Sequence, residues 1–227
     1  MADNARGICT KYHPVKKTIP DTPEHRARIA QRVQGLPARL EVKLAPLHGV
    51  SRSAEVRMLQ QASRAGTAAQ RIQWLRRAAD AGTQEAAKLS ACRRGCDHCC
   101  HQAVVIAKAE ALQIAKETGV PLNPLAGRFG AATKDLKLAQ EGLSKEAFGR
   151  ACVFLKDGGC SIYAHRPLTC RWHLNMDDDD LLCQLVEGDD PPGVPYLDMT
   201  AQTIEATACL GLHQTLDDIR EWFKPLH

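Results

Sequence analysis

The sequence predicts a mainly α-helical protein in which a cysteine cluster staples a short β-hairpin to the helices. Three observations lead to this fold class. Residues 53–89 are rich in Ala, Gln, Arg and Leu, which are good helix formers. Two short β-prone runs flank the Gly-containing segment 156–159, as in a β-hairpin. Nine of the ten cysteines lie between Cys92 and Cys209, and four of them fall within nine residues, which is too dense for scattered buried thiols.

The overall composition is that of a globular protein. Of the 227 residues, 44% are apolar and 25% are charged, which excludes a disordered chain and a collagen-like fibre. The longest strongly apolar stretch, 103–107, is far shorter than the ~20 residues that span a bilayer. No apolar segment lies near Met1, so a secretory signal is not expected. We therefore expect a cytoplasmic protein without a membrane partner.

The formal net charge of +4 hides a division of charge along the chain. Residues 1–94 hold 18 Lys and Arg against 7 Asp and Glu, a net +11, whereas residues 95–227 hold 12 against 19, a net −7. The first part contains only two of the cysteines. We therefore predict a basic helical region with an extended arm at 1–90 and a cysteine-rich, metal-binding domain at 91–227.

The N-terminal elements are predicted from prolines, glycines and a cap residue. Residues 1–20 show no hydrophobic period, so we expect an extended arm. Thr22 followed by Pro23 is a typical helix start, with Thr as the N-cap and Pro in the first turn. This helix should end near Gly35 and Pro37, because both residues interrupt helices.

The segment 53–89 predicts an amphipathic helical bundle. Apolar residues recur at helical spacing with arginines between them, and Gly66 and Gly82 should divide the segment into about three helices. The arginines have two interpretations: they form solvated faces of the bundle, or they form a basic surface that binds nucleic acid or an acidic protein. No aromatic interleaving or nucleic-acid motif accompanies the charge, which favours the first interpretation.

Short elements are predicted after the first group of cysteines. The β-branched run 104–106 indicates a short extended segment. A helix should run from about residue 108 to 118 and end at Gly119, and another should cover 124–140.

The C-terminal third should contain the hairpin and two more helices. The runs 153–155 and 161–163 flank 156–159 and predict two antiparallel strands with a tight turn. Pro167 suits the first turn of a short helix. The last helix is expected to span 200–223.

The cysteines form two clusters whose density favours ligation of a metal. A disulfide scaffold is disfavoured because such scaffolds are typically small secreted domains. A Cys-x2-Cys spacing lets two sulfurs converge on one centre, whereas adjacent cysteines usually point apart and can serve different centres. The first cluster consists of Cys92, Cys96, Cys99 and Cys100, and the second of Cys152, Cys160 and Cys170.

Together the two clusters resemble a known family. The motifs are Cys96-x2-Cys99-Cys100, Cys152-Val-Phe-Leu, Gly159-Cys160-Ser-Ile-Tyr163 and Arg166-Pro167-Leu-Thr-Cys170-Arg171. They are similar to those of the YkgJ-type cysteine-cluster family, a CxxCxxCC-type family, over roughly residues 90–175. That family is described as zinc- or iron-chelating and is often called iron–sulfur-cluster-containing.

The resemblance implies a metal site built from both clusters. Its ligands would be Cys92, Cys96, Cys99, Cys100, Cys152, Cys160 and Cys170. The usual description of the family favours a [4Fe–4S] iron–sulfur cluster, with Zn²⁺ as the alternative, because thiolates serve both. Four thiolates around Zn²⁺ or around a [4Fe–4S]²⁺ cluster leave a net charge of about −2. A site with this charge requires positive or hydrogen-bonding neighbours. The resemblance assigns that role to Arg166 and Arg171.

Other polar residues near the clusters are expected to be secondary. Cys183 and Cys209 lie outside the motifs, and Cys9 lies in the arm. The run Asp177–Asp180 lacks the Gly and the spaced carboxylates of a calcium loop, so we expect a solvated acidic loop. Seven thiols make histidine ligands unnecessary, although four histidines crowd the site: His98, His101, His165 and His173.

Three functions are compatible with these features. The leading one is a metal-binding protein with an iron–sulfur cluster. The second is a zinc-stapled interaction module whose basic N-terminal helices bind nucleic acid or an acidic protein partner. The third is a redox or protein-modifying enzyme, for which the sequence offers neither a Gly-rich nucleotide loop nor a Ser/His/Asp arrangement.

Overall fold

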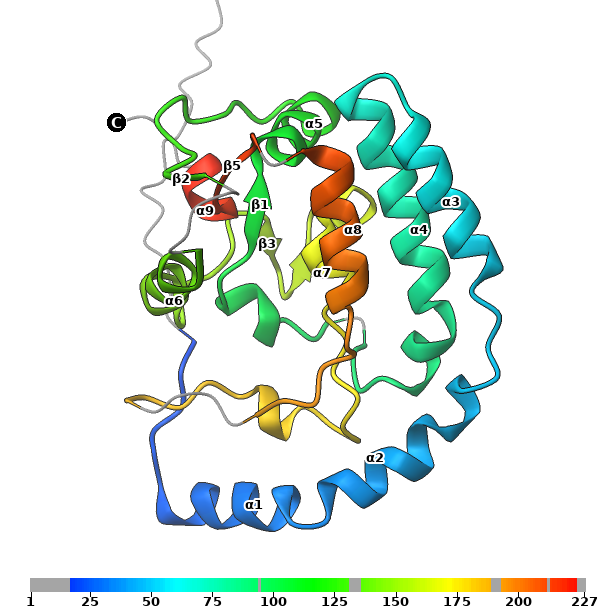
Figure 1. Ribbon diagram of the computed structural model, residues 1–227. Helices are drawn as coiled ribbons and strands as arrows, with labels where there is room; N and C mark the ends of the chain where they lie inside the picture. Colours follow the sequence, from blue (N-terminus) through cyan, green and yellow to red (C-terminus); the bar gives the residue numbers. More distant parts are fainter. Residues whose placement is uncertain (1–16, 94, 131–135, 189–192, 212, 224–227) are drawn as a thin grey trace, which may run out of the picture.

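Helices and two small antiparallel sheets make up the protein (Figure 1), which confirms the predicted fold class. The computed structural model describes residues 17–93, 95–130, 136–188, 193–211 and 213–223. The helices are α1 (Pro23–Val33), α2 (Leu36–Leu44), α3 (Ser53–Arg64), α4 (Ala68–Leu89), α5 (Lys108–Thr118), α6 (Leu136–Ala147), α7 (Leu168–Trp172), α8 (Thr200–Leu210) and α9 (Ile219–Trp222). The strands are β1 (Val105–Ala107), β2 (Phe129–Gly130), β3 (Leu155–Lys156), β4 (Gly159–Cys160) and β5 (Thr215–Asp218).

Local signals place several of these elements correctly. The Thr22 hydroxyl accepts a hydrogen bond from the His25 N–H (3.1 Å), so α1 starts at Pro23 as predicted. Helix α5 ends at Gly119, which adopts a left-handed conformation with φ 73°. The hairpin is also confirmed, with strands β3 and β4 shorter than expected and a turn at Asp157 and Gly158, both with positive φ.

In the first third, α1 ends just before Gly35 as predicted, one helix is unpredicted, and one helical prediction is wrong. The chain turns through Gly35, which has φ 71°, and begins the unpredicted helix α2 with Pro37 in its first turn. Helix α4 runs unbroken through Gly82, so 53–89 contains two helices instead of about three. A Cβ atom at Gly82 would lie 2.7 Å from the Glu55 carboxylate, so this glycine lets α3 approach α4 closely.

Two later helical predictions are wrong, and a buried aspartate accounts for the first of them. The helix expected at 124–140 is a loop followed by β2, and α6 starts only at Leu136; residues 131–135 lie outside the described part. The Asp217 carboxylate accepts the N–H groups of Gly127 (3.0 Å) and Arg128 (3.2 Å), which holds that loop in a non-helical path. The helix expected at 200–223 instead ends at Leu210, and β5 follows.

The three-stranded sheet has β5 at its centre. Its order is β1-β5-β2, and both pairings are antiparallel, with Ile106 opposite Asp217 and Phe129 opposite Leu216. Strand β5 thereby joins the C-terminal part of the chain to the segment that directly follows the first cysteine cluster.

Buried side chains form three core clusters. The first joins α3 and α4 to α7 and α8, so apolar contacts cross the compositional boundary near residue 90. The second lies among β1, α5, α9 and the hairpin. The third lies beneath α2 and holds Ala86, Leu174 and Met176. None of the helices in the described part is both long enough and apolar enough to cross a membrane.

Helices α1 and α2 extend beside the rest of the molecule (Figure 1) and are called the arm from here on; the extended segment predicted at 1–20 is a different part of the chain. The acidic run Asp177–Asp180 contacts the arm. Arg32 pairs with Asp177 (3.0 Å) and with Asp179, and the Lys43 ammonium donates to the Asp177 carbonyl (2.5 Å) and pairs with Asp178 (3.2 Å). Asp177 is only 1% exposed. The expected solvated loop at Asp177–Asp180 is therefore confirmed for Asp178 and Asp179, which are exposed, and wrong for Asp177, whose buried carboxylate pairs with Arg32 of α1.

Candidate metal centre

The first cysteine cluster occupies the turn that follows α4. Gly95 has φ 88°, a conformation that favours glycine and reverses the chain. The Cys96 N–H donates to the Arg93 carbonyl (3.0 Å), and the Cys100 N–H donates to the Asp97 carbonyl (2.9 Å). A short 3₁₀ helix, His98–His101, carries Cys99 and Cys100. The tight turn thus presents the sulfurs of this cluster from one compact loop.

The second cysteine cluster meets the first through a backbone hydrogen bond. The Cys152 N–H donates to the Cys100 carbonyl (2.7 Å). Cys160 lies on β4, and Cys170 lies on α7. Cys152 belongs to the second core cluster, and Cys100, Cys160 and Cys170 pack against that same core cluster. The fold therefore brings four cysteines from both sequence clusters around one apolar core.

Arg220 holds the junction of the two cysteine clusters. Its guanidinium donates to the carbonyls of Cys100 (2.9 Å), Arg150 (2.7 Å) and Ala151 (3.1 Å). Asp218 orients it through two contacts of 2.9 and 3.0 Å, and both side chains are at most 4% exposed. No sequence pattern indicates this support, because only the strand pairing of β5 brings Arg220 and Asp218 to Cys100.

Asn175 connects the first cluster to a cysteine outside the predicted set. Its backbone N–H donates to the Cys92 sulfur (3.4 Å), and its side-chain Nδ2 donates to the Cys183 sulfur (3.2 Å). Asn175 is 2% exposed, and Cys183 is buried. Cys183 therefore lies at the site, although the motif spacing placed it outside.

The remaining cysteines are distributed differently. Cys209 lies on α8, where it packs against the first core cluster. Cys9 is outside the described residues. All nine described cysteines are free thiols, with no disulfide among them.

Burial and mutual repulsion keep most of the site thiols protonated. Burial raises the pKa of Cys152 to about 11 and that of Cys183 to about 12, and it raises the pKa of Cys170 well above its ordinary value. Cys99 differs, because a hydrogen bond from the Cys100 thiol lowers the pKa of Cys99 to about 7 and raises that of Cys100. A metal ion must displace these protons, since thiolates are the ligands.

Arg166 is the cation that faces the sulfurs. Burial raises the pKa of Cys92, Cys160 and Cys170, and the positive charge of Arg166 opposes that rise. For Cys99 the same charge adds to the lowering of the pKa by the Cys100 hydrogen bond. The guanidinium carbon lies 4.2 Å from the centre of the Tyr163 ring, and the buried Nε has no hydrogen-bond partner. An unpaired buried donor beside thiols is suited to a charged sulfur acceptor.

Arg171 instead holds α7 against α4. It pairs with Asp80 (2.7 Å) and donates to the carbonyls of Arg166 (3.0 Å) and Ala164 (2.6 Å). Arg166 and Arg171 were both expected beside the sulfurs. Arg171 instead fixes the backbone segment from which the Arg166 side chain extends.

Three of the four nearby histidines have partners other than a metal. His98 contacts Asp180 (3.2 Å), His101 contacts the Asp97 carbonyl (3.1 Å), and His165 contacts Glu117 (3.1 Å). His173 is different, because burial lowers its pKa to about 4 and its Nε2 has no hydrogen-bond partner. Its ring stacks on Tyr196 at 3.8 Å between centroids.

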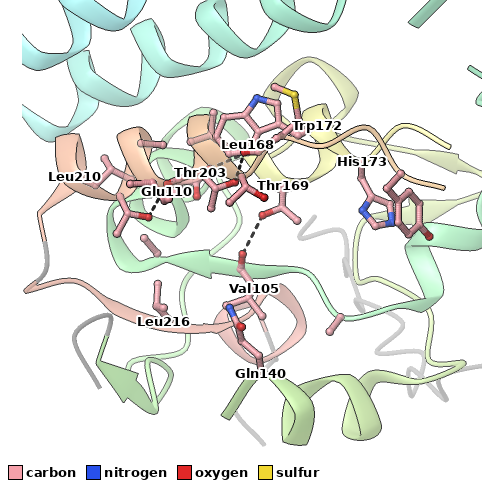
Figure 2. A pocket seen from close by; sticks show the side chains of 18 of the residues that line it. Val105, Glu110, Gln140, Leu168, Thr169, Trp172, His173, Thr203, Leu210 and Leu216 are labelled. Atoms are coloured by element: carbon pink, nitrogen blue, oxygen red, sulfur yellow. Dashed lines mark hydrogen bonds between the residues drawn. The ribbon is translucent and has the colours of Figure 1, made fainter. Parts of the chain in front are cut away.

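A cavity of about 890 Å³ borders the site. Figure 2 shows it between α8 and β1, with Glu110, Leu168 and Trp172 along one side and His173 at one end. Tyr196 also lines the cavity, and burial raises its pKa, with the nearby thiols of Cys183, Cys99 and Cys92 as further causes in the same direction. Tyr196 thus connects the wall of the cavity to the electrostatic environment of these cysteines, although no cysteine is among the lining residues.

The donor set fits a thiophilic metal, although the side chains have not converged on one. Within the described residues, no three Cys, His, Asp or Glu side chains are placed so that they could hold a metal ion as they stand. Neutral thiols pack as small apolar groups, and a metal site rarely exists before the metal binds. Soft thiolate ligands select Zn²⁺ or iron–sulfur clusters and do not suit Mg²⁺ or Ca²⁺.

The comparison with protein families agrees with this chemistry. Residues 91–187 match the family CxxCxxCC, described as a "putative zinc- or iron-chelating domain". This match confirms the family resemblance expected from the motifs. The CxxCxxCC region, residues 91–187, includes Cys183 and excludes Cys209. Neither the comparison with curated proteins nor the comparison with solved structures gave a match.

Proposed function

We propose that this protein holds a [4Fe–4S] cluster in its CxxCxxCC region. The observation that carries the proposal is the packing of four cysteines on the second core cluster, where thiols from the turn after α4, the hairpin and α7 meet. These ligands would be Cys100, Cys152, Cys160 and Cys170. When bound, such a cluster supplies one-electron transfer.

The surroundings of these four thiols support a buried anionic group. Phe154, Ile162 and Val104 exclude water on the core side. Arg166 supplies a positive charge and an unpaired Nε–H donor, which suit the net charge of about −2 on a four-thiolate centre. Zn²⁺ would take the same ligands, and the choice of the cluster follows the usual description of the family.

The decisive experiment is the visible spectrum and metal content of anaerobically purified protein. We expect a brown preparation with broad visible absorption and iron and sulfide in equal amounts. Cys170→Ser should lose the colour, whereas Cys209→Ser, the matched control outside the CxxCxxCC region, should keep it. A colourless protein with stoichiometric zinc and no iron would overturn the iron–sulfur proposal.

The nucleic-acid alternative remains a second candidate. Arg32 pairs with Asp177 and Arg76 with Glu117 (2.7 Å), whereas three other arginines of α3 and α4 are exposed: Arg57, Arg64 and Arg77. Strong salt-dependent binding of the chain to DNA or RNA would support this alternative.

We further propose a reducing compartment such as the cytoplasm. The described cysteines are all free, and thiols at this density would oxidise to disulfides in an exported protein.

A further inference from the structure

The cavity beside α8 has the size and the walls of a small-molecule site. Its volume is about 890 Å³, and none of the described residues that line it is a cysteine, so the metal centre does not account for it. The walls are largely apolar, with Val105 and Leu216 from the sheet, Leu168 and Trp172 from α7, and Leu210 from α8. Sites for small organic molecules have this size and composition, with a few polar groups that orient the ligand.

The threonine hydroxyls of the wall already donate to the backbone. The Thr203 hydroxyl donates to the Met199 carbonyl (2.9 Å), and the Thr207 hydroxyl donates to the Thr203 carbonyl (2.8 Å). The Thr169 hydroxyl donates to the Val105 carbonyl (3.2 Å). These three donors are therefore committed, and recognition of a ligand falls to the charged groups of the wall.

The charged side chains of the wall are acidic. The described lining residues include two carboxylates, Glu110 and Asp198, and neither Lys nor Arg. Asp198 is exposed, whereas Glu110 is only 5% exposed. A cavity whose charges have this sign attracts cations and repels anions.

Glu110 is a buried carboxyl without a cationic partner in the described part of the chain. Its Oε1 accepts the N–H of Leu168 (3.0 Å), which lies beside it in Figure 2. The charges of Arg76 and Arg171 reach Glu110, but each of these arginines pairs with another carboxylate at 2.7 Å. The wall thus holds a carboxyl that no side-chain cation neutralises.

A bound cation would offset the cost of burying this carboxyl. Burial raises the pKa of Glu110, and the Leu168 N–H and the two arginines oppose that rise. Its place in the first turn of α5 also favours a negative charge. An opposite charge within hydrogen-bond distance stabilises an ionised group strongly where water is excluded.

We propose that the cavity binds a small organic cation, an ammonium ion with an apolar body, through an ion pair with Glu110. Trp172 and Leu210 would contact the apolar body. Thr203 and Ile204 line the cavity and are exposed, so a ligand can enter from solvent along α8. This inference does not depend on the metal that the cysteines hold, because no cysteine lines the cavity.

The test compares three probes that share a phenylethyl body and differ in the charge of the head group: 2-phenylethylammonium, 2-phenylethanol and 3-phenylpropanoate. Their affinities for the full chain are measured at pH 7 by ligand-observed NMR titration. We expect the ammonium probe to bind at least about tenfold more tightly than the alcohol, and the carboxylate to bind most weakly. Equal affinities for the three probes, or no binding of the ammonium probe, would overturn the proposal.

Two variants assign the head-group preference to Glu110. Glu110→Gln keeps an acceptor for the Leu168 N–H but removes the charge, so it should weaken the ammonium probe about 10–100-fold and change the alcohol less than about twofold. Glu205→Gln removes the same charge from an exposed position of α8 outside the cavity and should change neither probe. Wild-type affinity for the ammonium probe in Glu110→Gln would refute the ion pair.

A third variant locates the probes without altering Glu110. Thr203→Phe places a ring at the exposed side of the cavity and should weaken the ammonium and alcohol probes alike. Unchanged binding in Thr203→Phe would show that the probes bind elsewhere. Thermal unfolding by circular dichroism checks each variant, and if Glu110→Gln does not fold, the wild-type preference and Thr203→Phe decide the outcome.

Discussion

At the scale of single residues, Arg166 is the arginine whose positive charge acts on four of the site thiols. Replacing it with Gln keeps a donor but removes the positive charge, so the reduced and more negative form of the proposed iron–sulfur cluster would lose stabilisation. We expect Arg166→Gln to lower the midpoint potential by about 60 mV, which corresponds to a tenfold change for a one-electron couple. A redox titration of the visible spectrum measures this shift.

Two control variants test whether the effect of Arg166→Gln comes from the charge at this position: one restores the charge, and the other removes a charge elsewhere. Arg166→Lys should restore part of the potential, because it returns the charge without the planar guanidinium. Arg57→Gln, on an exposed face of α3, should leave the potential unchanged. An unchanged potential in Arg166→Gln would show that the charge is too well screened to act on the cluster.

The sequence identifies the cysteine motifs, but it does not show which of the nearby arginines faces the sulfurs. Arg166 and Arg171 have the same residue type and similar positions in the motif, yet one faces sulfurs and the other faces Asp80 on α4. The difference depends on how α7 packs against α4, a long-range contact that no local pattern encodes. Cys183 was underestimated for the same reason, since Asn175 brings it to Cys92 across 83 positions of the chain.

At the scale of elements, ion pairs attach the arm to the body in addition to the apolar contacts of α2 with the third core cluster. Arg32 and Lys43 contact the aspartates of the acidic run, of which Asp178 is about half-exposed. Raising salt to about 1 M shortens the Debye length to about 3 Å and should weaken the exposed pairs. We expect faster amide hydrogen exchange in α1 and α2 at high salt, with little change in α4.

The variant Arg32→Ala distinguishes the loss of the ion pairs that attach the arm from a general loss of stability. Arg32→Ala should speed exchange in α1 and α2 already at low salt, because it leaves the buried Asp177 without its partner. Arg57→Ala, which removes a charge of the same sign from α3, should not. Equal exchange in α1 for both variants would argue against docking by the acidic run.

The central strand β5 depends on the ionised form of Asp217. Burial alone would raise the pKa of this carboxyl, but hydrogen bonds from the Arg128 guanidinium (2.9 Å) and from nearby backbone N–H groups outweigh burial and lower it. A carboxyl with a lowered pKa stabilises the fold above its unfolded value of 3.8, and this contribution is lost as pH falls through the folded-state pKa.

Asp217→Asn should therefore destabilise the protein in a pH-dependent way. At neutral pH we expect a loss of about 2–3 kcal/mol in the free energy of unfolding, as for a hydrogen bond to a charged group. The difference from wild type should shrink as pH falls below about 3.8, where the carboxyl of the unfolded chain takes up a proton, and it should vanish only below the lowered folded-state pKa. Urea unfolding at both pH values measures it, with Glu85→Gln on the surface as control. A difference that is independent of pH would contradict the assignment.

The elements show where sequence reasoning succeeds. Helices α1 and α5 and the hairpin were predicted because a cap, a left-handed glycine and a two-residue turn are local signals. Strand β5 was taken for part of a helix because its pairing with β1 joins residues more than one hundred positions apart. Tertiary pairing overrides local propensity in such segments.

At the scale of the whole molecule, the basic and cysteine-rich regions share one core. Leu75 on α4 is fully buried in the same cluster as Leu168 and Leu210 from the other side of residue 90. We expect urea unfolding to be a single transition, with tryptophan fluorescence and far-UV circular dichroism coinciding. Leu75→Ala should lower both midpoints together and cost about 2–5 kcal/mol. Two separate transitions would show that the regions unfold independently.

The contact between Arg220 and Cys100 also sets an order of events during synthesis. The two residues are 120 positions apart in the chain. Because ribosomes add about 5–20 residues per second, Arg220 is synthesised roughly 6–24 s after Cys100. Until then, the turn that carries the first cysteines lacks the hydrogen bond from Arg220. In that interval the early thiols emerge before Cys152, Cys160 and Cys170 exist to join them. Metal delivered to the nascent chain would find an incomplete set of ligands, so loading belongs after translation of the last strand, and a reducing milieu must protect the thiols until then.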